Sequence, residues 1–537
     1  MKTPNSGSLV SRTVRIGDLR SHRVLGFQLL FAAAVVTLWE ILAVTIFAHR
    51  FVLPTPTSIV ATGWRDHFYG SDLVATLSEA RLGWLIGNSL ALALATLTLV
   101  SRRAEGILVS FGVMTYAVPT VAIGPILFIV QTPFAAKITM SALSVFFVTL
   151  VAAVAGLQAA SKTSLEMVAA FGGGKWSILR RVRIRASVPS IAAGLCISAP
   201  AAILGAMIGD YFGGQSGLGV VMLQAQQQLS VSRTWAIAGV TTVVSGTAYG
   251  ITLWLTRRFG SGNAVSTDIS GSPQGSAKRS TKEHLAATAR VIGGIALALG
   301  IWTALVHSSG LGGYFLKTPL AVWDYLFSTP QSEQNRQMIL SALSATLAHA
   351  GAGWILGTVL AIIGAVILVL SPAATRVVMP LVLVVRSVPL VAMTPLLALM
   401  FGRGLAGITV IAALVTVVPS LVTLSDGLQS APPPALDLIR SIGGGQLKAL
   451  TRVRAMYGAP AIFTAAKISM PGAILGAVLA EWLVSGSGVG HAMSLDVVGS
   501  NFSNLWASIA LVVAVSLVLY FAVNAAERAI RSRLAIS

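Results

Sequence analysis

The sequence predicts an all-α membrane protein with about twelve transmembrane helices, arranged as two parallel repeats of six. Charged residues make up 10% of the chain, against about 25% in ordinary soluble proteins. Apolar runs such as 25–47 and 506–526 reach the roughly 20 residues that a helix needs to cross a bilayer. Motifs of the first half also recur 270 or 271 positions later. These observations disfavour the alternative of a soluble protein with a large core.

The membrane spans follow from the apolar runs, which are too long and too uniform for the alternating strands of a β-barrel. The first run is too long for a signal peptide, so we expect it to be retained as a span. The predicted spans lie near 25–47, 80–100, 106–130, 138–157, 190–210 and 235–256, then 286–306, 345–370, 375–401, 405–425, 461–482 and 506–526. The predicted domains are a cytoplasmic N-terminal segment, a first six-helix domain, a flexible Gly/Ser-rich cytoplasmic linker and a second six-helix domain, at 1–24, 25–259, 260–285 and 286–537.

Membrane topology accounts for the net charge of +20. With the N-terminus in the cytoplasm, the predicted inner segments hold 27 of the 37 Lys and Arg residues, and the outer segments hold eight. This is the pattern of the positive-inside rule, and it places both termini and the linker in the cytoplasm. The sequence therefore predicts a multi-pass protein of the inner or plasma membrane, in contact with lipid and without a nucleic-acid partner.

The two halves are internal repeats, because separate motifs recur in the same order and at almost the same offset. The matching pairs are "ATLSEARLGWLIG" (75–87) with "ATLAHAGAGWILG" (345–357), "VPTVAIGPIL" (118–127) with "VPLVAMTPLL" (388–397), and "DYFGGQSGLG" (210–219) with "EWLVSGSGVG" (481–490). The copies have diverged elsewhere. Where the first half has "QTPF" (131–134), the second has "FGRG" (401–404), and this difference predicts an asymmetric pathway.

A basic loop lies between the fourth and fifth spans of both halves, at 158–189 and 430–460. Loops of this length are usually functional. In the first, we expect a short helix that breaks at the glycines beginning with Gly172, then a basic helix that ends near Pro189, where the fifth span begins. Such a surface could bind anionic lipid or a partner protein. The glycines lack the spacing and the strand–helix context of a phosphate-binding loop, so a partner would have to use any ATP.

This loop resembles the EAA loop of the transmembrane subunits of ABC importers, whose pattern is about E-A-A-x-x-x-G with a proline further on. Glu166, Ala169, Gly172 and Pro189 fit the pattern in the first half, and Asp437, Gly443 and Pro460 fit it in the second. Met167 and Leu438 stand where the pattern has alanine at its second position. Two further blocks, "RSVPLVAMTPLL" (386–397) and "FGRG", are similar to the branch that imports nitrate, sulfonates, taurine and thiamine precursors.

The resemblance implies a type I importer permease fold, with two fused permease domains and no catalytic, metal or cofactor site on this chain. It implies two cytoplasmic ABC ATPase subunits that use ATP and Mg, an extracytoplasmic binding protein, and a small, anionic solute as cargo. The residues expected to dock on the ATPase are Glu166, Ala169, Ala170, Gly172, Gly173, Asp437, Gly443 and Gly444.

Pathway and gate residues are expected in the matched proline blocks and at the ends of the fifth spans. They are Pro119, Pro125, Asp210, Arg386, Pro389, Pro395 and Glu481. Arg386 could favour an anionic cargo, or it could equally extend to the interface or pair with a helix end. A substrate site at Asp210 and Glu481 is disfavoured because carboxylates repel an anion.

For Asp210 and Glu481 we favour a structural gate, in which each carboxylate accepts backbone N–H bonds from the glycine turn that follows. Direct contact with the binding protein and a passive position on the surface remain alternatives. Among whole-protein functions, a proton-coupled transporter of the major-facilitator type would share the two six-span halves but would not explain the matched basic loops. A membrane enzyme is disfavoured because the seven histidines show no metal-ligand spacing.

Overall fold

The computed structural model describes most of the chain, and every regular element in the described part is a helix. The described residues are 30, 33–45, 53–66, 69–97, 107–108, 111–112, 120–259, 281–310, 313–371, 373–375, 378–379, 382, 394, 397–398 and 400–534.

Eight of the helices in these residues are long and apolar enough to cross a membrane. They include α3 (Tyr69–Leu97), α6 (Pro133–Gln158), α9 (Ile184–Gly213), α11 (Val231–Phe259), α14 (Ser332–Leu370), α17 (Leu405–Gln429), α20 (Ala455–Val484) and α22 (Phe502–Leu534). The sequence predicts about twelve spans, so eight of them have a full-length helix in the described residues. The predicted spans at 25–47 and 286–306 contain only the shorter apolar helices Ala33–Thr45 and Ile292–Ser308, the latter within α12 (Thr281–Ser308).

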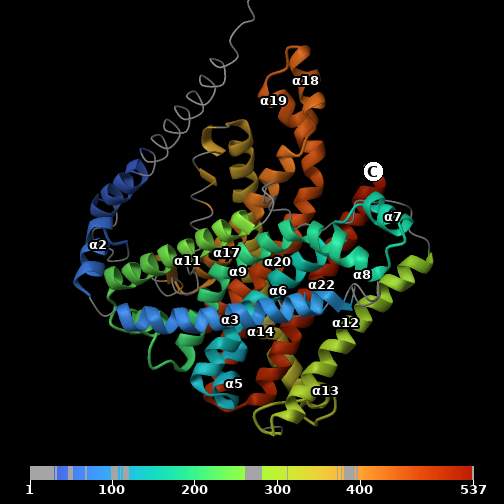
Figure 1. Ribbon diagram of the computed structural model, residues 1–537. Helices are drawn as coiled ribbons and strands as arrows, with labels where there is room; N and C mark the ends of the chain where they lie inside the picture. The colour runs from blue at the N-terminus through green and yellow to red at the C-terminus, as the bar shows by residue number, and fades with distance from the viewer. Residues whose placement is uncertain are drawn as a thin grey trace, which may run out of the picture.

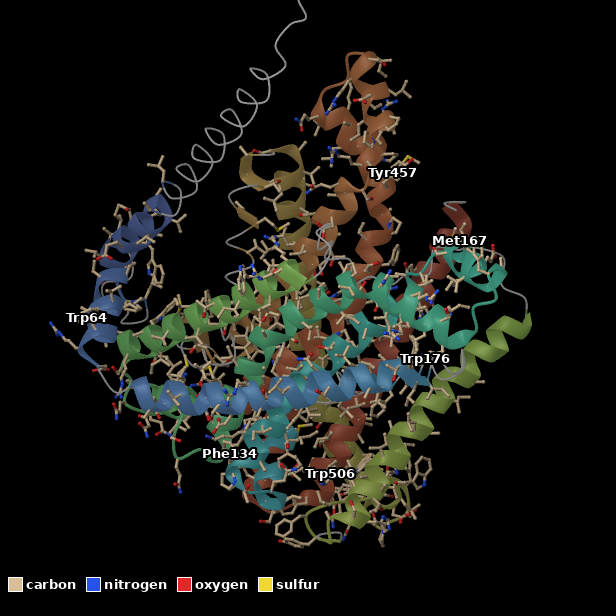
Figure 2. All side chains as sticks on the ribbon, viewed as in Figure 1. Trp64, Phe134, Met167, Trp176, Tyr457 and Trp506 are labelled. Atoms are coloured by element: carbon tan, nitrogen blue, oxygen red, sulfur yellow. The ribbon has the colours of Figure 1, made fainter. Side chains whose placement is uncertain are left out.

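The predicted spans at 106–130 and 375–401 fall largely outside the described residues. Their longest described element is α5 (Thr120–Val130). Two short helices, α2 (Pro56–Arg65) and α13 (Pro319–Phe327), lie in segments where the sequence predicts only loops. Each begins with a threonine N-cap followed by proline, which is a common helix start. Figure 2 shows Trp64 pointing away from the rest of the protein at the end of α2.

The packing of the long helices repeats between the halves. In the first half α6 packs between α3 and α9, and in the second α17 packs between α14 and α20. Glycines allow the close approach. A Cβ on Gly83 would lie 2.3 Å from Ser141 Oγ, and one on Gly353 would lie 2.4 Å from the Ala412 methyl group. Small residues at such spacing let membrane helices approach closely.

A pair of interhelical hydrogen bonds also repeats. The indole N–H of Trp84 on α3 donates to Ser198 Oγ on α9 at 3.0 Å, and Trp354 donates to Ser469 Oγ at the same distance in the second half. These matched contacts join the middle of α3 to the middle of α9, and the middle of α14 to the middle of α20.

The two halves meet through the proline-containing helix α5 and the ends of the fifth spans. Ala122 and Ile126 of α5 share a buried core with Ala473 and Ala477 of α20. The rings of Phe212 and Trp482, which follow the acids of the two halves, make an edge contact with 6.0 Å between centroids. In Figure 1, α5 and α13 lie at the opposite end of the molecule from α18 (Pro433–Ser441) and α19 (Gln446–Ala449).

Candidate functional site

Each predicted docking loop folds as a short helix that ends at a glycine bend. In the first loop, α7 (Lys162–Ala170) begins at an N-cap, Ser161, and stops before Gly172, which has a φ of 76°. In the second, α18 stops before Gly443, whose φ is 72°. Glycine adopts this left-handed conformation without the steric cost that a Cβ imposes. The predicted break at the glycines is therefore confirmed in both halves.

The second glycine of each bend is required for a different reason. The N–H groups of Gly172 and Gly173 donate back to Ala169 and Val168, and those of Gly443 and Gly444 donate to Arg440 and Ile439, which gives both helices a closed C-terminal cap. A Cβ on Gly173 would lie 2.5 Å from the Val168 side chain, and one on Gly444 would lie 2.4 Å from that of Ile439. The bends are thus fixed structures rather than loose connections.

Both loops expose matched apolar side chains. Met167, Phe171 and Trp176 in the first loop, and Leu438, Ile442 and Leu447 at the corresponding positions of the second, are between 62% and 85% exposed. Glu166, Ala169 and Ala170 are exposed beside them on α7, as is Asp437 on α18. Asp437 pairs with Arg440 on its own helix at 3.1 Å. Figure 2 shows Met167 at the edge of the protein.

The expectation that a separate basic helix ends near Pro189 is wrong. After α8 (Lys175–Ile178), a π-helical turn at Leu179–Arg183 leads directly into α9, so that residues 176–213 form one helix with Pro189 inside it. The second half repeats this arrangement with a π-helical turn at Leu450–Arg454. The π-helical turn keeps the helix continuous between α8 and α9. The docking loop is therefore joined to the fifth span by unbroken helix.

The predicted acids at the outer ends of the fifth spans are buried rather than exposed. Asp210 is 2% exposed and Glu481 is fully buried. This excludes the alternative of passive surface acids, and in this conformation it also excludes direct contact of the carboxylates with a binding protein. The surface alternatives failed because the turn after each span folds back over its acid.

Each acid binds the glycine turn that follows it, as predicted. The N–H of Gly219 donates to Asp210 Oδ2 at 3.1 Å, and the N–H of Gly490 donates to Glu481 Oε2 at 3.0 Å. The turns also need glycine at Gly217 and Gly488. Both have positive φ, and a Cβ on either would lie within 2.5 Å of the carboxylate oxygens.

A threonine on the second span completes this arrangement in both halves. Thr76 Oγ1 donates to Asp210 and accepts the N–H of Leu218, and Thr346 Oγ1 donates to Glu481 and accepts the N–H of Val489. All four distances lie between 2.7 and 3.0 Å. We refer to each acid, its threonine and its glycine turn as an acid–turn unit.

Sequence reasoning missed the basic partners of the two acids. Lys137, expected in an outer segment, lies buried on α6 with its Nζ 2.8 Å from Asp210 Oδ1 and 3.0 Å from Glu79 Oε1. In the second half His349 Nδ1 lies 2.7 Å from Glu481 Oε1. The repeat could have pointed to polar contacts at this place, because Thr76 and Glu79 align with Thr346 and His349 in motifs already matched at offset 270.

The remaining predicted pathway residues are only partly described. Pro125 lies inside α5, at the contact between the halves. Pro119, Arg386, Pro389 and Pro395 lie outside the described residues, so their roles stay predictions.

The fold, the paired loops and the twin acid–turn units define a membrane protein built from two copies of one unit. Comparison with protein families agrees with this. The family described as "Binding-protein-dependent transport system inner membrane component" matches twice, at residues 87–261 and 353–536. The chain belongs to this family, and it is a tandem fusion of two permease units.

Individual relatives each cover less than half of this chain and most of their own length. A probable ABC transporter permease protein of Haemophilus influenzae is 28% identical over 230 residues, which are 43% of this chain and 91% of that protein. The formylaminopyrimidine transport permease protein ThiX of Halalkalibacterium halodurans is 28% identical over 37% of this chain and 80% of its own. The putative aliphatic sulfonates transport permease protein SsuC of Bacillus subtilis is 29% identical over 39% and 77%. The chain is thus a membrane subunit of a binding-protein-dependent ABC transporter, located in the inner membrane with several spans.

Proposed function

We propose that this chain supplies both halves of the translocation pathway of an ATP-driven importer, with two cytoplasmic ATPase subunits bound at α7 and α18. The observation that carries this proposal is the matched exposure of apolar side chains on two rigid loops. A soluble loop has no reason to keep three large apolar residues exposed at the same positions of both repeats, whereas a protein interface does. The chain itself is a transport subunit, and the partner ATPase subunits use the ATP and Mg.

The cargo that we propose is a small, anionic solute of the sulfonate, taurine, nitrate or thiamine-precursor class, delivered by an extracytoplasmic binding protein. Support comes from the sequence blocks that resemble this branch, and from a relative named for aliphatic sulfonates and another for formylaminopyrimidine.

Docking is tested by placing a charge within the apolar surface. Met167→Lys and Leu438→Lys should each weaken capture of the ATPase about tenfold or more, because a lysine desolvated at an interface costs more than 1.4 kcal/mol. Glu166→Lys and Asp437→Lys should weaken it too. Gln227→Lys, also exposed but on α10 (Leu218–Gln227) rather than on a docking loop, is the control and should bind normally. Recovery of the ATPase with tagged permease measures the effect, and normal capture by all four loop variants would refute the docking surface.

We propose further that the two acid–turn units form the outer gate. Support comes from their position at the contact between the halves, where Phe212 and Trp482 meet. Asp210→Asn and Glu481→Gln keep the shape of each acid but remove its charge, and charged acceptors make roughly twice as strong hydrogen bonds as neutral ones. Both variants should lower binding-protein-stimulated ATP hydrolysis while the complex stays assembled, and the double variant should be lower still. Full stimulation in the double variant would rule out the gate.

A further inference from the structure

One hydrogen bond of the acid–turn unit in the first half has no counterpart in the second half. In the first half, three successive N–H groups of the turn each reach a side-chain acceptor, and the first of them, that of Gly217, donates to Asp72 Oδ1 at 2.8 Å. In the second half the position of Asp72 is taken by Ala342. The corresponding N–H, that of Gly488, has no acceptor among the described residues, although the residue is buried. Buried backbone N–H groups are nearly always paired.

A cavity of about 410 Å³ occupies the place of the missing carboxylate. It lies between α14 and α21 (Val489–Val498), and both Ala342 and Gly488 line it. Its wall also contains Ser508, which is 1% exposed and makes no hydrogen bond with any described residue. A second donor, deeply buried and independent of the turn, therefore faces the same space. The other polar residues of the wall are Ser341, Ser487, His491 and Asn504.

The acids near the cavity are already occupied. The carboxylate oxygens of Glu481 accept from Thr346 and Gly490 and contact His349. Both oxygens of Asp496 accept from the Asn504 amide. What the cavity offers to an incoming group is thus mainly hydrogen-bond donors, with His491 as the titratable group in the wall.

We propose that this cavity is a binding site for a carboxylate or sulfonate group, which takes the place that the Asp72 carboxylate holds in the first half. The chain itself shows what the site accepts, since its other copy fills the same position with an anionic oxygen. The group could belong to a free small anion or to an acidic side chain of the binding protein, and both have the same chemistry at the site.

The test uses the purified full chain and methanesulfonate as the probe. Ligands that bind only the folded state raise its unfolding temperature in a saturable way. Methanesulfonate should therefore raise the unfolding temperature saturably above equal potassium chloride, and neutral dimethyl sulfone should not. Ala342→Asp should abolish this rise, because it supplies the internal carboxylate. Ser344→Asp adds the same charge on α14 outside the cavity and should keep the rise.

Two further variants keep the proposal testable if Ala342→Asp does not fold. Ser508→Ala should weaken the binding of methanesulfonate about tenfold, as expected for the loss of a hydrogen bond to a charged group. Asp72→Ala should enlarge the rise, because it opens the same position in the first half. Absence of a saturable rise in the wild type, or a full rise in Ala342→Asp, would overturn the proposal.

The anionic group could come from a free anion or from the binding protein, and capture of the binding protein by the same variants distinguishes the two. Weaker capture by Ala342→Asp than by Ser344→Asp assigns the site to an acidic side chain of that protein, and equal capture assigns it to a free anion. The thermal measurement needs neither transport nor ATP hydrolysis, so its failure would leave the proposed function standing.

Discussion

Lys137 and Glu79 of the first half are both replaced by other residues in the second half. At the aligned positions the second half has Gly407 and His349, so it lacks both the lysine and the second carboxylate. In the first half Lys137 contacts Glu79 and Asp210 within 3.0 Å, and all three side chains are at most 4% exposed. A buried charge is tolerated only with its partner present. The repeat therefore occurs in two arrangements, a lysine with two carboxylates in the first half and a histidine with one carboxylate in the second.

This arrangement predicts that removing Lys137 costs less stability when Glu79 is removed with it. Lys137→Met leaves two carboxylates buried without their cation, which should lower the free energy of unfolding by about 3–5 kcal/mol. Lys137→Met with Glu79→Gln leaves one buried carboxylate instead of two, that of Asp210 with its bonds from Thr76 and the Gly219 N–H, and should recover part of that loss. Unfolding of the purified variants in detergent measures both. A double variant no more stable than the single one would contradict the argument.

At the scale of elements, α21 is held to its neighbours by a chain of polar side chains. The hydroxyl of Tyr325 on α13 donates to Asn504 on α22, whose amide donates to both oxygens of Asp496 on α21. Burial raises the pKa of Asp496 to about 6 from its ordinary value of 3.8, and the Asn504 hydrogen bond only partly offsets this. The folded protein therefore holds this proton more tightly than the unfolded chain does.

This shift predicts how stability depends on pH. Because the pKa is raised on folding, the contribution of Asp496 is greatest below the unfolded pKa and falls as the pH rises through about 4 to 6, by about 3 kcal/mol in all. Asp496→Asn should remove this fall. Relative to wild type, the variant should therefore be more stable near pH 7.5 than it is near pH 4. Asp324→Asn, an exposed change on α13, is the control. Parallel pH profiles of wild type and Asp496→Asn would contradict the assignment.

The sequence predicts elements well where the signal is local. Apolar runs locate the long helices, and glycine with helix-ending patterns locates the bends at Gly172 and Gly443. It starts α3 and α14 too late, at 80 and 345 instead of Tyr69 and Ser332, because their first turns carry polar residues such as Asp72, which binds the glycine turn, and Arg336, which binds α13. Contacts between distant segments, such as Lys137 with Asp210, have no local signal, and only the aligned repeat could have suggested them.

At the scale of the whole molecule, fusion makes the two halves obligate partners and fixes their ratio at one to one. Their differences can then specialise. The first half keeps Asp72, Glu79 and Lys137, whereas the second has Ala342, His349 and Gly407 with a cavity beside its turn. A dimer of one unit could not hold both arrangements in a fixed ratio. Such a division of labour also requires that both docking loops face the same compartment.

Topology is the prediction that tests this requirement. The 27-to-8 distribution of basic residues places both docking loops and the linker in the cytoplasm. Gly174→Cys and Gly445→Cys suit the experiment because a Cβ at either position meets no atom within 4 Å, and Ser270→Cys samples the linker. The native Cys196 is buried and is replaced by serine. In intact cells all three cysteines should resist an impermeant thiol reagent and react after lysis. Labelling of one loop but not the other before lysis would place the halves in opposite orientations and exclude two parallel repeats.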